Sequence, residues 1–413
     1  LRALSPRYRW RRWQIAGCRP RESPGLPQAN SGLPSPESGH ETVEIRVSSG
    51  SPGLRVVRGG RVDLRAAILG SIVITWLPLL ALSLLAGVAW DGQIGVPFLR
   101  DFLPYGQFLI AVPALLLAER IIPERLNEAA AELVRSNVVA PADSAELQRY
   151  LDRAATRWGG SIVTGTIVAV TLAATIASFV EARDWLTGSW QVSDGALTLP
   201  GWWYLVISLP ILRFLELRWI WRLMVWVRFL WRVPSLELYP RPSHPDRAGG
   251  LAFLGEAQLA FSWLVLAFGA QISCLIADQV YFQGADLMAS RGYVAAFVAI
   301  SVLILLLPLL AFTPRLARAR YDGILYLSGR GFEGAGAVED HLRASKGSVP
   351  ADDVSGLADY GVLLDNARMM RPAPLELRHV VVLVLIALLP FLPLVFLVMP
   401  AQEVLRTLAH LLL

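Results

Sequence analysis

Uncharged apolar stretches, each long enough to cross a bilayer, recur along the chain and limit its fold more than any other feature. A transmembrane α-helix needs about 20 mainly apolar residues to cover about 30 Å of hydrocarbon. With 54% apolar and only 17% charged residues, this chain of 413 residues is too hydrophobic for a soluble protein. We therefore predict an all-α, polytopic transmembrane helix bundle of about seven spans, by window hydropathy. The spans are expected near residues 66–90, 102–122, 159–180, 199–222, 257–277, 293–312 and 380–399.

The distribution of basic residues predicts the orientation of these spans. Lys and Arg next to a span are retained on the cytoplasmic side. With a cytoplasmic N-terminus, 34 of the 38 basic residues lie inside, and only Arg100, Arg183, Arg291 and Arg406 lie outside. The prediction is N-in/C-out, with short cytoplasmic helices in 123–158, 223–256 and 313–378. The net charge of +5 mostly reflects this bias, which favours contact with anionic lipid and is poor evidence for nucleic-acid binding.

The N-terminal residues differ in composition from the rest of the chain. Residues 1–55 combine a basic stretch with Pro, Ser and Gly and have little to bury, so we expect a disordered tail before a transmembrane domain at 56–413. No apolar h-region follows the basic stretch, so it is not a secretory signal. The two cysteines, Cys18 and Cys274, fall in the tail and in the fifth span, which gives no disulfide framework.

The first cytoplasmic segment is expected to hold two short helices. Pro123 stands where a proline often opens a helix, at the first helical position. Asp143 and Glu146 have the spacing of a capping box at the start of the second helix.

The fourth span carries more charge than the others. A continuous helix from Trp202 to Arg232 would be about 46 Å long, which exceeds the hydrocarbon thickness, so we expect it to leave the bilayer partway. Four arginines share one stripe of this helix and are expected to reach anionic lipid head groups, while two tryptophans on the other side lie in the aromatic belt. The arginines are Arg218, Arg222, Arg228 and Arg232, and the tryptophans are Trp219 and Trp226.

Arg213 and Glu216 lie deeper in the same span and form a candidate intramembrane charge pair. A charge there costs at least ~2.5 kcal/mol on insertion scales, so each side chain needs a partner. They are spaced to pair with each other at i and i+3. The alternative is that they face a water-filled cavity and contact an ion or a substrate.

The segment YPRPSHPDRAGGLAFLGEAQ (residues 239–258) is the richest in chemical groups. Ser243 and Asp246 match the S-x-x-D signature of a helix start, and the diglycine suggests close packing. The alternative is an anion or ligand site at a helix N-terminus, where free N–H groups and a cation converge. Its candidate residues are His244, Asp246, Arg247, Gly249 and Gly250.

Motifs of known enzyme classes are missing from the sequence. It contains no H-E-x-x-H, no G-x-S-x-G and no P-loop. His341, His379 and His410 are isolated, and each is more often a satisfied or solvated histidine than a metal ligand. We therefore predict no catalytic residue, no metal site and no cofactor.

The segment H-P-D-R-A-G-G-L (residues 244–251) resembles an H-P-D-x-x-G-G-L segment that precedes a transmembrane helix in uncharacterised multi-pass inner-membrane proteins of bacteria. The resemblance implies a bacterial inner membrane and brings no activity with it. A single lysine among the 38 basic residues indicates a GC-rich genome, which fits that origin.

Two functional hypotheses remain open at this point. Solute or ion translocation is favoured by the charges in the fourth span, by prolines within spans and by acids at the outer mouths, such as Glu181 and Asp278. A membrane scaffold or sensor, docking partners through its cytoplasmic helices, is favoured by the lack of any deep, unpaired carboxylate. An enzyme acting on a phosphorylated lipid is third, and a homo-oligomer is compatible with each.

Overall fold

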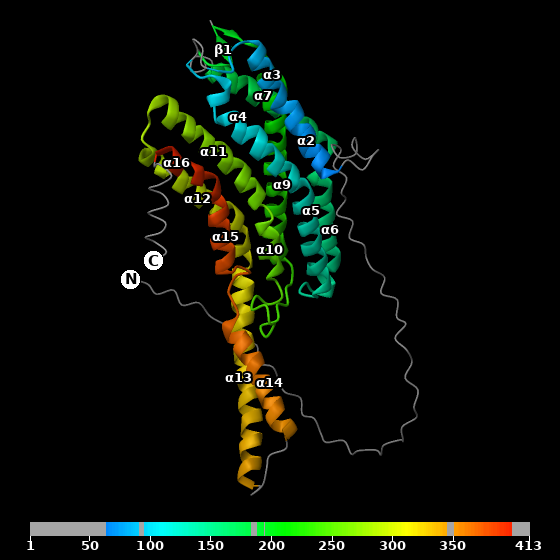
Figure 1. Cartoon of the computed structure of the whole chain (residues 1–413). Coiled ribbons are helices and arrows are strands. Elements are labelled where there is room, and N and C mark those ends of the chain that lie inside the picture. Colours follow the sequence, from blue (N-terminus) through cyan, green and yellow to red (C-terminus); the bar gives the residue numbers. More distant parts are fainter. Residues whose placement is uncertain (1–62, 91–94, 183–187, 194, 345–350, 399–413) are drawn as a thin grey trace, which may run out of the picture. The chain divides into compact units, whose positions relative to one another are not determined.

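The computed structural model describes residues 63–90, 95–182, 188–193, 195–344 and 351–398 as a helical bundle (Figure 1). The predicted tail at 1–55 and the residues after 398, with His410, lie outside this part. Short backbone pairings mark two ends of the bundle. At the hairpin end, Val96 pairs with Ser189, next to a short β-hairpin; at the loop end, Val139 pairs with Leu238.

The elements of the first half run from the N-terminal helix to the hairpin. They are α2 (Leu64–Thr75), α3 (Leu77–Leu85), η1 (Phe98–Arg100), α4 (Leu103–Tyr105), η2 (Gly106–Ala111), α5 (Val112–Arg135), η3 (Pro141–Asp143), α6 (Ser144–Trp158), α7 (Ser161–Ala182), β1 (Val192–Ser193) and β2 (Ala196–Leu197). The two strands pair antiparallel, with Val192 opposite Leu197.

In the described residues of the second half, every regular element is a helix. Its elements are α8 (Leu199–Trp203), η4 (Tyr204–Ser208), α9 (Leu209–Arg232), η5 (Val233–Ser235), α10 (Phe253–Leu259), α11 (Ser262–Gln283), η6 (Leu287–Ser290), α12 (Arg291–Leu306), η7 (Leu307–Phe312), α13 (Thr313–Ala344), α14 (Ala351–Met369), α15 (Leu377–Leu388), η8 (Leu389–Phe391) and α16 (Leu392–Val398). Segments η2 and η4 are π-helical, and the other η segments are 3₁₀.

Six helical stretches in the described part are long and apolar enough to cross a membrane, as in an integral membrane protein. They are 64–85, 103–135, 161–180, 253–283, 287–340 and 377–395, each overlapping a predicted span. The predicted span at 199–222 is not among them, because α9 carries five arginines and one glutamate. A seventh span and the N-in/C-out orientation stay predictions.

Helix α9 lies inside the bundle, packed against α5, α6 and α7. The placement of its tryptophans in an aromatic belt is wrong, because Trp219 and Trp226 are buried. The Trp219 indole N–H donates to the carbonyl of Leu115 at 3.1 Å, and that of Trp226 donates to the Gln258 side chain at 2.8 Å. Both indoles therefore find their polar partners on neighbouring helices instead of at a head-group layer.

The first cytoplasmic segment also differs from its prediction. Pro123 does not open a helix but lies within α5, which continues to Arg135. Helix α6 begins at Ser144 as expected, yet the Asp143 side chain makes no cap bond to it. That carboxylate accepts the backbone N–H of Glu237 at 2.7 Å, so it ties α6 to the loop after α9.

Candidate functional site

Two carboxyl groups meet at the hairpin end, where η1 passes into α4 beside α11. Asp278 of α11 accepts the backbone N–H groups of Phe102 and Leu103, at 2.8 and 3.1 Å. Asp101 accepts the same Leu103 N–H at 3.0 Å, so the two carboxyl groups lie side by side and form an acid pair. Two carboxyl groups this close, each bonded to the same backbone N–H, interact strongly when either one gains or loses a proton.

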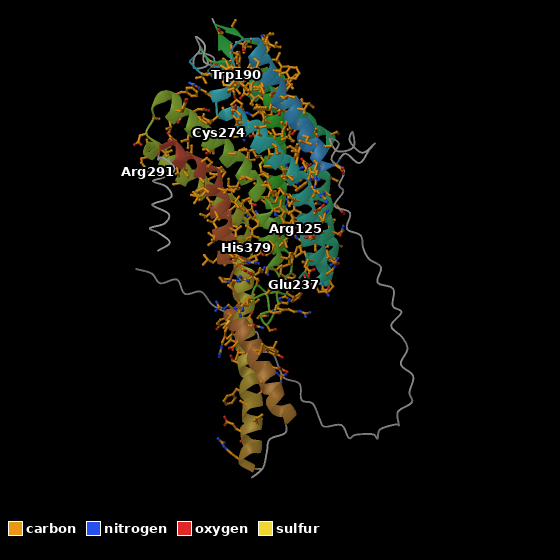
Figure 2. All side chains as sticks on the ribbon, viewed as in Figure 1. Arg125, Trp190, Glu237, Cys274, Arg291 and His379 are labelled. Atoms are coloured by element: carbon orange, nitrogen blue, oxygen red, sulfur yellow. The ribbon has the colours of Figure 1, made fainter. Side chains whose placement is uncertain are left out.

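The acid pair is held from the hairpin side by a buried tryptophan. The Trp190 indole N–H donates to Asp101 at 2.7 Å, and the ring packs edge-on against Phe98 and Tyr204. Burial raises the pKa of Asp101, and hydrogen bonds from Trp190 and Leu103 oppose part of that rise. Figure 2 shows Trp190 and Cys274 toward this end and His379 and Glu237 toward the other.

Next to the acid pair, the two π-helical segments contact each other. The Tyr204 hydroxyl of η4 donates to the Gln107 side chain of η2 at 3.1 Å, and both residues are buried. Gly106 opens η2 against α11, where an added Cβ would lie 2.6 Å from the Cys274 sulfur. Single-turn π segments occur often at functional sites, because they place side chains that a regular helix would turn away.

Further along α9, the predicted charge pair finds its partners on other helices. Glu216 is buried and accepts a hydrogen bond from the Gln271 amide of α11 at 2.6 Å. Arg213 donates to the Ser178 hydroxyl of α7 at 3.4 Å. Within the described residues no ion pair joins the two side chains within 4 Å, so each acts as a link from α9 to a different neighbour.

Closer to the loop end, Arg218, Arg222 and Glu119 form a buried ionic cluster. The prediction that these two arginines reach lipid head groups is therefore wrong. Arg222 is only 1% exposed and lies 2.7 Å from Glu119 of α5, so its guanidinium cannot reach a lipid head group. It also lies over the rings of Trp219 and Trp158, 4.8 and 5.4 Å from their centroids. Arg218 shares the same carboxylate at 3.5 Å. Packing of α9 against α5 and α6 therefore turns this part of the stripe inward.

The segment around H-P-D-R-A-G-G does not begin a helix, so the predicted helix start at Ser243 is wrong. Residues 241–250 form successive turns, and α10 begins only at Phe253. The Asp246 carboxylate accepts three backbone N–H groups, from Ala248, Gly250 and Ala252, at 2.8 to 3.1 Å. The predicted anion site would use these same N–H groups, and the chain's own carboxylate occupies them.

The candidate residues of this loop serve mainly to fold and dock it. His244 lies with Nδ1 2.8 Å from Asp246 Oδ1. Arg247 adopts a left-handed backbone (φ 53°) and is exposed, while its carbonyl accepts the backbone N–H of Arg371 at 2.7 Å. Gly249 has φ +68°, and a Cβ there would lie 2.7 Å from Pro240 and 2.9 Å from Met370. Gly250 has φ +88°.

The loop is thus a structural joint between the bundle and the helices after α13. The Arg371 guanidinium donates to the Asp246 carbonyl at 2.7 Å, and the Asn366 amide donates to the Ser243 carbonyl at 3.3 Å. Burial alone would raise the pKa of Asp246, but the hydrogen bonds from Ala248, Ala252 and Gly250 together lower it.

His379 is a buried histidine whose two ring nitrogens both have partners. It is 1% exposed, and its Nε2 lies 3.2 Å from Glu256 of α10. Its Nδ1 accepts the backbone N–H of Glu376 at 3.1 Å, which completes a capping box at the start of α15. This is the satisfied histidine that was expected. Among the described residues, no three His, Cys, Asp or Glu side chains gather in a way that could hold a metal ion.

Sequence reasoning missed the acid pair. The sequence predicts Asp278 only as an acid at an outer mouth, and no motif points to Asp101. The one available signal was a lone aspartate directly before the second span, in DFLPYG. The side chains of Glu181 and His341 lie outside the described part.

The fold and its apolar helices define an integral membrane protein of the helical-bundle class. Within that class, the acid pair and the buried polar side chains of α9 distinguish this chain from a bundle held by apolar packing alone. No family model matches the chain, and no curated protein sequence or solved structure is significantly similar to it.

Proposed function

We propose that this protein translocates a small solute or ion across a bacterial inner membrane, and that protons binding at Asp101 and Asp278 drive or gate the movement. The observation that carries the proposal is the acid pair itself. Ionisable groups within a membrane bundle are costly to bury and usually mark ion pathways or proton relays. A pair that shares one proton can bind or release it with a small change in geometry.

The buried polar groups of α9 supply a route away from the acid pair. Tyr204, Glu216 and Arg222 follow one another along η4 and α9 from the hairpin end toward the loop end. Tyr204 and Arg222 are bonded to the helical stretch 103–135, through Gln107 and Glu119, and Glu216 is bonded to α11 through Gln271. These polar groups are separated by apolar core, so they do not form a continuous water-filled path. Such an interrupted series suits a gated proton relay better than a permanent pore.

Two features of the helices around the acid pair support a movement of this kind. Two π-helical segments stand beside it, and a change to regular α-helix would rotate the residues that follow them. A cavity of about 520 Å³ is lined by Phe102, Cys274 and Pro390, and also by Ala277, the residue before Asp278. Deprotonation of both acids would place two negative charges in contact, which favours separation of α4 from α11 toward this cavity.

The test uses purified protein in proteoliposomes with a pH-sensitive dye trapped inside. An imposed pH gradient or candidate solute gradient should give a flux that Asp278→Asn and Asp101→Asn reduce at least about tenfold, because neither amide can release a proton. Asp286→Asn is the matched control, since Asp286 is exposed at the same end and asparagine keeps its capping role. Equal flux in Asp278→Asn and wild type would exclude proton coupling at this pair.

A second candidate is a membrane scaffold that docks partners through α13 and α14. It is favoured by large apolar side chains that these two helices leave exposed, among them Tyr326, Phe332 and Val362. Under this alternative, Phe332→Ser should abolish capture of a partner while Asp278→Asn leaves capture unchanged. An enzyme acting on a phosphorylated lipid stays the third possibility from sequence.

A further inference from the structure

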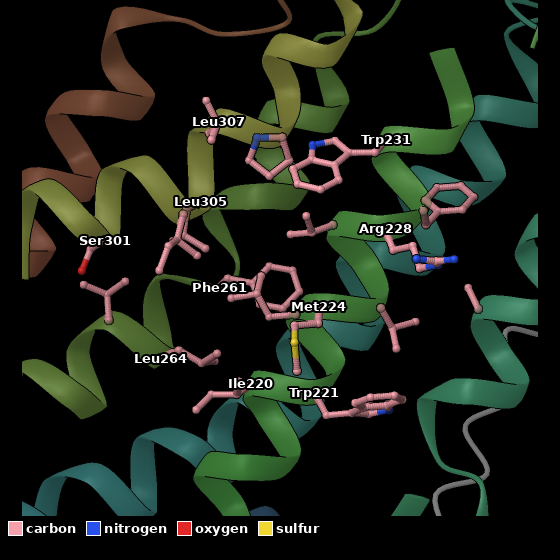
Figure 3. Close-up of a pocket in the computed structure, with 18 of the residues that line it drawn as sticks. Ile220, Trp221, Met224, Arg228, Trp231, Phe261, Leu264, Ser301, Leu305 and Leu307 are labelled. Carbon is pink, nitrogen blue, oxygen red and sulfur yellow. The ribbon is translucent and has the colours of Figure 1, made fainter. Parts of the chain in front are cut away.

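An apolar groove of about 1140 Å³ runs between α6, α9, α11 and the turn from α12 into η7, apart from the acid pair. Figure 3 shows Met224 of α9 and Phe261 facing each other in it, with Leu264 and Leu305 further along. Several lining side chains on the open side are about half exposed, as at Met224 (52%) and Ile300 (53%). In a membrane protein such a surface is covered by lipid chains, since water is excluded there.

One wall of the groove is cationic. Arg153 and Arg157 come from α6, and Arg228 and Arg232 come from α9. The two helices lie along each other in opposite directions, with Arg232 over the Tyr150 ring and the Trp221 indole on the Arg157 carbonyl. No carboxylate of the described chain lies within 4 Å of any of these four guanidinium groups.

The groove therefore combines a long apolar wall with a row of cations that the described residues leave without an acidic partner. We propose that it binds one anionic phospholipid, with acyl chains along Met224 and Phe261 and the phosphate held by Arg228, Arg232 and the two α6 arginines. Basic pockets between transmembrane helices bind anionic head groups in this way, and guanidinium forks match phosphate oxygens. A second copy of the chain is the weaker occupant, because it would bring the same positive charges to this surface.

The test compares lipids that share chains and differ in charge. Wild-type protein in neutral detergent is titrated with dioleoylphosphatidylglycerol, dioleoylphosphatidylcholine or inorganic phosphate. Thermal unfolding measures stabilisation by each ligand, and native mass spectrometry counts the lipids bound per chain. The anionic lipid should bind one per chain and raise the melting temperature, while phosphate alone should not, because it lacks the buried chains.

Two variants probe the two halves of the site separately. Arg228→Gln with Arg232→Gln should weaken binding of the anionic lipid about 25-fold, since each cation near a head group contributes about fivefold. The matched control is Arg120→Gln with Arg125→Gln, which removes two exposed arginines of α5 from outside the groove. Met224→Trp fills the groove, keeps every charge, and should also reduce binding.

Unchanged affinity in the Arg228/Arg232 double variant would overturn the proposal, as would equal binding of both lipids or full stabilisation by phosphate. Lipid-independent dimerisation that the same double variant abolishes would assign the groove to a second copy and overturn it as well. Loss of the anionic lipid in Met224→Trp, with the control double variant unaffected, supports it even if the arginine variant fails to fold.

Discussion

Replacing Glu119 by glutamine should leave the buried Arg222 cation without a carboxylate partner. Arg222 is 1% exposed, Glu119 is its carboxylate partner at 2.7 Å, and Arg218 lies 3.5 Å from the same group. Removing one partner of a buried ion pair costs about 3–5 kcal/mol. The stacks of Arg222 on Trp219 and Trp158 are the same in wild type and variant and cancel. Glutamine keeps one oxygen that can accept from Arg222, so we expect a somewhat smaller loss, of about 2–4 kcal/mol.

The assay is thermal unfolding of the purified protein in neutral detergent. With about 2 °C lost per kcal/mol in a chain of this size, Glu119→Gln should melt about 4–8 °C below wild type. Glu124→Gln is the matched control, because Glu124 stands five residues further along α5 in an exposed pair with Arg120. The free energy of unfolding of Glu124→Gln should stay within about 0.5 kcal/mol of wild type.

A rescue variant separates lost charge pairing from damaged packing. Adding Arg222→Met to Glu119→Gln removes the stranded cation and should recover at least half of the loss, since apolar side chains of similar volume replace buried ion pairs well. A melting temperature for Glu119→Gln within about 1 °C of wild type would refute the argument. So would a double variant less stable than either single change.

Three further predictions address the loop at 239–252 and the orientation. Gly249→Ala should lower the free energy of unfolding by about 1–3 kcal/mol in thermal unfolding, because Gly249 has a left-handed backbone and a Cβ there would contact Pro240 and Met370. Gly284→Ala should lower it less, because Gly284 has a similar backbone (φ +64°) but open space around it. The fold lowers the pKa of Asp246 below 3.8, so this carboxylate stabilises the protein above about pH 4. That stability is lost as the pH falls through the lowered pKa. A pH series of melting temperatures should show this loss in wild type and less of it in Asp246→Asn. A reporter fused after residue 413 should be extracytoplasmic and one inserted at 340 cytoplasmic, and finding both on one side would reject the seven-span prediction.

Local sequence pattern accounts for the helices but not for their partners. The apolar stretches predicted a helical bundle, and six of the seven predicted spans overlap helices that are apolar enough to cross a bilayer. Hydropathy succeeds here because a backbone in hydrocarbon has no alternative to internal hydrogen bonds. Pro123 shows the limit of the same reasoning, since packing of α5 carries the helix through a residue that often begins one.

The candidate site depended on contacts between distant segments. Asp101 and Asp278 are 177 positions apart in sequence, and only the packing of α4 on α11 makes them one site. Arg222 and Trp219 fitted an interfacial helix by composition, but α5 and α6 cover that face of α9 and reverse the expectation. The S-x-x-D signature likewise predicted a cap, and Asp246 instead folds the loop that receives Arg371.

The sequence by itself determined that this chain forms apolar helices for a membrane, because the need to satisfy every backbone polar group acts residue by residue along a span. It also determined the bias of basic residues that predicts orientation. Tertiary structure alone decided which charged side chains are buried, which carboxyl groups lie side by side and which arginines line the groove. Those properties depend on the distance between groups on different helices, and no local pattern of residues encodes that distance.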